Sequence, residues 1–370
     1  MKNQVKIRNS AIELLRIISM IMIVFHHFAV HGGFDFGVSL SPTHFWYNFI
    51  VMGGKIGVNI FVLISGYYLI DNDKKIFDVN KILKFVGQIW FYSVAIFIIS
   101  LMTVGVDLNI KEIIKTLFPI TFSRWWFAST YFVLYLVHPY LNKLLHGLDK
   151  YLYQKLLLLL IVCWSIIPTL TTSSFQSNSL LWFITLYAIS GYIKLYGFNI
   201  KFSTKHYFFA FLISMTLTYS SSVALMLLGN KWSFLTNNIT YFYGQEKLTV
   251  LLISLCLFMC FSTLKMNYHK SINILASATF GVYLIHDNHI IRQLLWINWF
   301  ENARYQESLF LIPYSIMVVV VVYIVCSLVD LIRINTIEKP CMKLVKRYSG
   351  KMMEPFERIV TLFKNFIFGK

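Results

Sequence analysis

Long apolar stretches recur along the whole chain and constrain its fold more than any other feature. A helix needs about 20 apolar residues to cross a bilayer, and stretches of this length follow one another from residue 12 onward. The chain is 57% hydrophobic and only 13% charged, whereas a soluble domain has roughly 25% charged residues. Most of it is therefore expected in lipid. Ten spans are predicted, near 12–31, 46–70, 81–105, 124–142, 156–171, 179–197, 207–228, 248–264, 274–298 and 309–332.

The 33 Lys and Arg residues are distributed unevenly between these spans. The two ends of the chain and every second loop hold 24 of them, whereas the intervening loops hold six. Because basic loops stay in the cytoplasm, this alternation predicts an all-α, polytopic transmembrane helix bundle with both termini cytoplasmic. The net charge of +17 thus follows from topology, and no nucleic-acid partner is expected.

The two ends of the chain are basic and less hydrophobic than the middle. Residues 1–11 are predicted as a basic cytoplasmic tail, 12–332 as the transmembrane domain, and 333–370 as a second cytoplasmic tail. Apolar residues between Phe356 and Ile367 recur at roughly helical spacing. We therefore expect this tail to be amphipathic and to lie on anionic membrane lipids.

Ionisable side chains within apolar spans are costly and usually functional. Arg16 and His27 lie in the first span, eleven residues apart, which is close to three helical turns and about 16 Å. Both therefore lie on one face, where the guanidinium suits phosphate and the deeper imidazole suits proton transfer. The alternative is that Arg16 pairs with Glu13 and that His27 hydrogen-bonds a neighbouring helix.

The segment IELLRIISMIMIVFHH, which holds Arg16 and His27 with ten residues between them, resembles the first span of the membrane-bound acyltransferase-3 family. Three later segments resemble the family in the same order: GGKIGVNIFVLISGYYL at 53–69, WWFASTYFVLYLVHPYLN at 125–142 and TFGVYLIHDNHIIR at 279–292. The resemblance implies an O-acyltransferase of a bacterial plasma membrane. Its donor would be cytoplasmic acetyl-CoA, and its acceptor a hydroxyl of a capsular, exopolysaccharide or other surface glycan, free or lipid-linked.

The resemblance also implies roles for single residues. His27 would be the catalytic residue, either as general base on the acceptor hydroxyl or as a transient acyl carrier. Arg16 would bind the phosphates of coenzyme A, with Glu13, Lys74 and Lys75 beside it at the cytoplasmic face. No metal is expected.

The remaining candidates are predicted to line a pocket for the acceptor. Lys55 either faces a wet cavity or pairs with Asp287, and His286 is either catalytic or a structural hydrogen-bonding residue. Tryptophans near outer helix ends either anchor the protein at the interface or stack on sugar rings. The predicted pocket residues are His26, Lys55, Ser65, Arg124, Trp125, Trp126, Tyr131, His286 and Asp287.

A non-enzymatic carrier is the alternative function, because intramembrane His, Lys and Asp also form translocation paths. A glycan flippase or a small-molecule transporter would fit, and a membrane glycan polymerase is a third possibility. Carriers usually have broken helices at the binding site, and no break is evident in the sequence. Proteins that assemble envelope glycans are the expected partners in the transferase interpretation.

Overall fold

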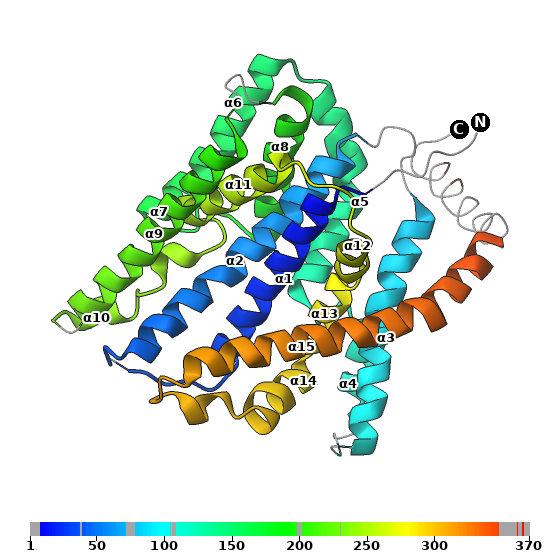
Figure 1. The fold of residues 1–370 in the computed structure, drawn as a ribbon. Coiled ribbons are helices and arrows are strands. Elements are labelled where there is room, and N and C mark those ends of the chain that lie inside the picture. Colours follow the sequence, from blue (N-terminus) through cyan, green and yellow to red (C-terminus); the bar gives the residue numbers. More distant parts are fainter. Residues whose placement is uncertain are drawn as a thin grey trace.

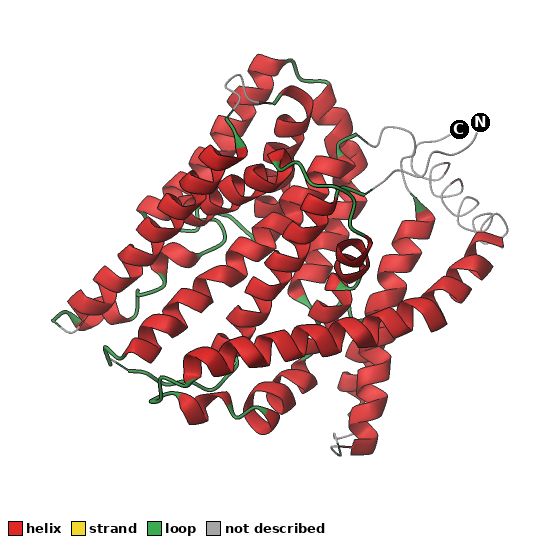
Figure 2. Cartoon of the chain, viewed as in Figure 1, coloured by secondary structure: helices red, strands yellow, loops and turns green. Residues whose placement is uncertain are grey.

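The computed structural model describes residues 8–37, 39–71, 78–103, 105, 109–197, 202–229, 231–347, 361 and 365. Within these ranges the chain consists of helices and loops, without a strand (Figure 2). The prediction of an all-α fold is confirmed. The predicted amphipathic stretch from Phe356 to Ile367 lies outside the described residues apart from Thr361 and Asn365, and so do Lys74 and Lys75, which were predicted at the cytoplasmic face.

The helices follow one another in a single long series (Figure 1). Its first half comprises α1 (Ser10–Val30), α2 (Pro42–Leu69), α3 (Val79–Thr103), α4 (Ile110–Leu117), α5 (Trp126–His146), α6 (Lys150–Ile161), η1 (Val162–Ile166), α7 (Ile167–Leu170) and α8 (Ser179–Tyr196). Its second half comprises α9 (Thr204–Gly229), α10 (Ser233–Thr236), η2 (Tyr241–Tyr243), α11 (Leu248–Thr263), α12 (Lys270–Ser277), α13 (Thr279–His286), α14 (His289–Gln293), η3 (Leu294–Trp299), η4 (Asn302–Tyr305), α15 (Leu311–Arg333) and η5 (Ile334–Glu338).

Among the described residues, eight helices are long and apolar enough to cross a membrane. They match eight of the ten predicted spans. The other two predictions, 124–142 and 274–298, correspond to α5 and to the series from α12 to η3. The count of ten spans and the cytoplasmic position of both termini stay predictions.

Helices α1 and α2 run antiparallel through the centre of the bundle (Figure 1). Helix α1 begins after Asn9, whose side chain accepts a hydrogen bond from the Ala11 amide, and such a cap stabilises a first turn. The two helices approach closely because a Cβ at Gly54 would overlap the His26 ring and one at Gly57 would overlap the Ser19 carbonyl. This close approach brings the side chains of α2 beside the histidines of α1.

The segment predicted as one span over 274–298 is not a single helix. It is divided into α12, α13, α14 and η3, and the break between α13 and α14 falls at Asp287 and Asn288. Asn288 caps α14 by accepting a hydrogen bond from the Ile290 amide. A polar pair in the middle of an apolar stretch thus ends one helix and starts the next.

Three of the tryptophans predicted to anchor helix ends at the interface are buried in the protein core. Trp125, Trp182 and Trp296 are fully buried, so they pack the bundle and do not anchor it at the interface. Trp232 and Trp299 are exposed, as an aromatic belt requires.

Candidate active site

A cavity of about 470 Å³ lies between α1, α2, α3, α5, α13 and α14. Arg16 and His27 both line it, which confirms that they share one face of α1. Helix geometry places them about 16 Å apart along α1. Since α2 is antiparallel to α1 and Gly54 faces His26, Lys55 lies at the His27 end and Ser65 near the Arg16 end. The cavity therefore has two chemically different ends.

His27 contacts a second histidine from a distant part of the chain. Its Nδ1 lies 2.9 Å from Nε2 of His286, which is fully buried on α13. His286 Nδ1 lies 2.6 Å from the Val282 carbonyl oxygen, which accepts hydrogen bonds only, so this Nδ1 carries the proton. His286 Nε2 is then an acceptor, and His27 Nδ1 must donate to it. This chain of contacts leaves Nε2 as the basic nitrogen of His27.

Asp287 forms the next part of the same cluster. Its Oδ1 accepts a hydrogen bond from Arg292 Nε at 2.9 Å and lies 3.4 Å from His27 Nδ1 and 3.8 Å from His31 Nε2. Its Oδ2 is buried without a hydrogen-bond partner among the described residues, and Asp287 lines the cavity. The arrangement places one carboxylate beside the ring of His27, with Arg292 balancing its charge.

His31 also lines the cavity and was missed by the sequence analysis. The signal was present, because His27 and His31 stand four residues apart and therefore share a face of a helix. Their ring centres are 5.2 Å apart.

His27, His31 and Asp287 also have the spacing of metal ligands, since one ligand atom from each lies within 4.8 Å of the others. Arg292 already occupies the same oxygen of Asp287, and His286 occupies His27 Nδ1. These contacts favour a hydrogen-bonded cluster over a metal site. The expectation that the protein needs no metal stays a prediction.

The hypothesis that Lys55 pairs with Asp287 is wrong, because no ion pair within 4.0 Å joins these described side chains. Lys55 lines the cavity instead, with its Nζ 5.2 Å from the centre of the Trp126 ring. His26 also lines the cavity, and its Nδ1 donates to the Val51 carbonyl at 2.7 Å. The alternative that Lys55 faces a cavity is therefore the one the structure supports.

The predicted residues near Arg16 divide into two groups. Ser65 and Tyr131 line the cavity, and the Ser65 hydroxyl donates to the Phe61 carbonyl at 2.8 Å. Glu13 does not line it; the carboxylate is buried 4.0 Å from Arg16 Nη1, so the alternative i,i+3 pair is present. Arg16 reaches the cavity despite this pair.

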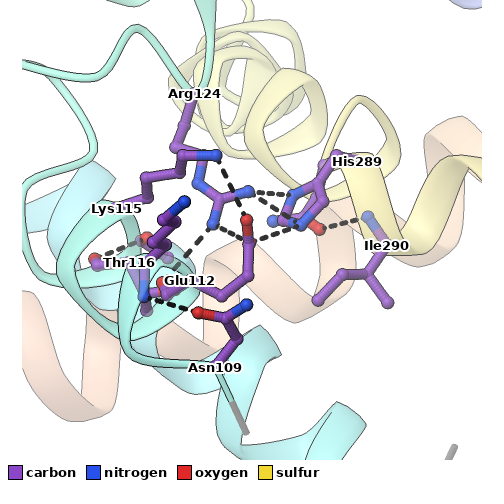
Figure 3. Close-up of polar contacts among 10 residues, drawn as sticks. Asn109, Glu112, Lys115, Thr116, Arg124, His289 and Ile290 are labelled. Atoms are coloured by element: carbon purple, nitrogen blue, oxygen red, sulfur yellow. Dashed lines mark hydrogen bonds and ion pairs between the residues drawn. The ribbon is translucent and has the colours of Figure 1, made fainter. Parts of the chain in front are cut away.

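Arg124 and Trp125, both predicted for the pocket, do not line the cavity. Arg124 donates hydrogen bonds to Glu112 and His289, linking α4 to α14 beside the site (Figure 3). This hydrogen bond, aided by Lys115, holds the pKa of the Glu112 carboxyl below its ordinary value. The Glu112 carboxyl therefore stays ionised at neutral pH, and its ion pair with Arg124 is lost only as the pH falls through that lowered pKa. His289 contacts Arg124 at 2.8 Å, between Arg124 Nη1 and the His289 Nε2.

Comparison with known proteins identifies the family of the chain. A family model for an acyltransferase domain, that of the acyltransferase-3 family, matches residues 9–329. No curated protein and no solved structure matches the chain. The matched range contains α1, which holds Arg16 and His27, and α13, which holds His286. With eight helices able to span a membrane and one family domain over most of its length, the chain belongs to the acyltransferase-3 family of membrane acyltransferases.

Proposed function

We propose that the protein is an O-acetyltransferase of a bacterial plasma membrane that moves acetyl from cytoplasmic acetyl-CoA to a hydroxyl of a cell-envelope glycan. The observation that carries the proposal is the cavity that joins Arg16 to His27, in which the contacts of His286 leave His27 Nε2 as the basic nitrogen. A capsular polysaccharide, an exopolysaccharide or a lipid-linked glycan is the acceptor. Proteins that assemble such glycans are the expected partners.

The length of the cavity suits a donor with a phosphate-bearing head and a long acyl arm. A guanidinium binds phosphate through paired hydrogen bonds, so Arg16 would hold the head. Apolar residues between the two ends, among them Met20, Ile23 and Phe61, line the path of the arm. The thioester would then lie near His27, about three helical turns from Arg16.

The chemistry needs one base and one stabilising charge. His27 Nε2 would remove the proton from the acceptor hydroxyl as its oxygen attacks the thioester carbonyl. The new ester C–O bond forms, the C–S bond breaks, and the coenzyme A thiolate takes the proton from the imidazolium. Between these steps the positive ring lies 3.4 Å from the Asp287 carboxylate, which stabilises it.

A carrier is the second candidate, because one observation favours it. Transporters bind substrates where helices are broken, and the chain breaks between α13 and α14 at Asp287, beside the cavity. The ordered contact between His27 and His286 favours the transferase, since a fixed tautomer is a requirement of base catalysis and not of transport.

The proposal is tested by the acetyl content of envelope glycans, measured by mass spectrometry in wild-type cells, a deletion strain and His27→Ala cells. We expect one acetyl ester to be absent from the deletion strain. His27→Ala membranes should transfer acetyl about 10²–10⁴-fold more slowly than wild type, the usual contribution of a general base. Immunoblots of membranes control for abundance. Unchanged glycan acetylation in the deletion strain would refute the proposal and favour the carrier.

A further inference from the structure

Lys55 projects into the His27 end of the cavity, and no carboxylate of the described residues forms an ion pair with it. It follows Gly54, which packs against His26, and its Nζ faces the Trp126 ring at 5.2 Å. Among the described residues no carboxylate lies within 4.0 Å of this ammonium; Glu246 and Asp287 act on it only from farther away. In the part of the chain that the structure describes, this half-buried cation is thus left without a close partner of opposite charge.

Such an arrangement is costly in an empty site and favourable in an occupied one. An ammonium that loses water needs a replacement for its solvation, and an aromatic ring supplies only part of it. An anionic group of a ligand would supply the rest. Charged side chains within a membrane domain usually mark where a substrate binds, for this reason.

The other charged residues that line the cavity are either paired with one another or lie at its opposite end. Arg292 donates to Asp287, so this pair is neutral as a unit. Arg16 lies at the opposite end, about three helical turns from His27. If Arg16 holds the phosphates of the donor, those phosphates do not reach Lys55. Of the stable anionic groups on the two substrates, only one carried by the acceptor is then left for Lys55.

We propose that Lys55 binds an anionic group of the acceptor, a carboxylate or a phosphate, close to the hydroxyl that receives the acyl group. The inference rests on the proposed function and narrows it, because neutral glycans would leave Lys55 unpaired. Two kinds of acceptor share this chemistry: glycans that contain acidic sugars with a carboxylate, and glycans whose units are joined or substituted by phosphate.

The test identifies the sugar or polyol that loses acetyl in the deletion strain and compares this mark among Lys55 variants. Mass spectrometry of glycan fragments gives the chemistry of the acetylated unit and its neighbours. We expect a carboxylate or a phosphate on that unit or on the adjoining one. Whichever group is found shows whether the acceptor contains acidic sugars or phosphate. We expect Lys55→Gln to lower the acetyl mark about tenfold or more, and Lys55→Arg, which keeps the charge, to retain most of it.

Lys231→Gln is the matched control, because Lys231 also lies over a tryptophan ring, at 5.1 Å from the centre of Trp232, but is exposed and does not line the cavity. It should leave the mark unchanged. Membrane abundance of each variant is checked by immunoblot, and Lys55→Arg keeps the test valid if Lys55→Gln fails to fold. A neutral acetylated unit with neutral neighbours, or wild-type acetylation in Lys55→Gln, would overturn the inference alone. Unchanged acetylation in the deletion strain would overturn the proposed function and the inference with it.

Discussion

His27 Nδ1 has two neighbours, and their distances separate their roles. His286 Nε2, at 2.9 Å, is within the ordinary range of an N–H hydrogen bond, whereas Asp287 Oδ1, at 3.4 Å, lies beyond it. His286 therefore orients the ring and selects its tautomer. Asp287 contributes mainly charge, which matters most when the ring becomes positive.

This division of roles predicts the effect of replacing His286. His286→Leu removes the acceptor for His27 Nδ1, and a buried donor without a partner costs about 1–3 kcal/mol, or roughly tenfold to a hundredfold in rate. His286→Gln retains an acceptor oxygen and should lose less activity. Both are measured as the rate of acetyl transfer by purified membranes at several pH values. Equal loss in the two variants would show that His286 only fills space.

The spacing of residues along a helix predicted which side chains share a face, but not which side chains of different helices meet. The shared face of Arg16 and His27 followed from the helical period, and the structure confirms it. The same rule would have found His31, four residues after His27. The predicted pairing of Lys55 with Asp287 was wrong because it rested only on a similar depth in the membrane. Whether two side chains at one depth meet also depends on how their helices are rotated, and here Lys55 faces Trp126 while Arg292 contacts Asp287.

At the scale of helices, the position of α13 depends on its contact with α15. A Cβ at Gly281 would overlap the carboxyl group of Asp330, which is fully buried on α15. Asp330 Oδ1 accepts hydrogen bonds from Tyr92 at 2.7 Å and from Arg333 at 2.7 Å. This network fixes the carboxylate against α3 and α15, so it cannot give way easily. The contact with Asp330 on α15 therefore determines the position of α13, and with it that of His286.

We accordingly predict that Gly281→Ala displaces α13 and weakens the His27–His286 contact. Overpacking of this kind costs about 1–3 kcal/mol of unfolding free energy. Gly87→Ala is the matched control, because a Cβ there meets no atom within 4 Å. Thermal unfolding and acetyl transfer are compared for both variants in the same lipid. A Gly281→Ala protein with the stability and activity of Gly87→Ala would refute the role given to this contact.

At the scale of the whole molecule, the cavity is assembled from helices that are far apart in the sequence. Its walls come from α1, α2, α3, α5, α13 and α14, which span residues 10–293. Helix α15 crosses in front of α1 and α3 in Figure 1 and packs on α13. A site of this kind forms only when the bundle closes, because no two neighbouring helices contain all of its groups.

The predicted topology is tested with two thiols, one near each expected face. Cys341 is exposed and should lie on the cytoplasmic side, whereas Ser308, also exposed, should lie outside. In intact cells, a membrane-impermeant maleimide should label a Ser308→Cys, Cys341→Ser variant and spare Cys341 in the wild-type chain. After permeabilisation both should react. The reverse pattern in intact cells would invert the topology.

The sequence alone was sufficient for the properties that depend on local composition and helical period. Apolar length and charge alternation predicted a helical membrane protein, and the four family segments predicted an acyltransferase, which the family match bears out. The tertiary structure alone decided which groups meet: His286 on His27, Arg292 on Asp287, Trp125 in the core and Lys55 in the cavity beside Trp126. These contacts join residues from different helices, and they depend on the rotation, depth and breaks of each helix. The packing of the whole bundle determines those quantities, and no local stretch of sequence specifies them.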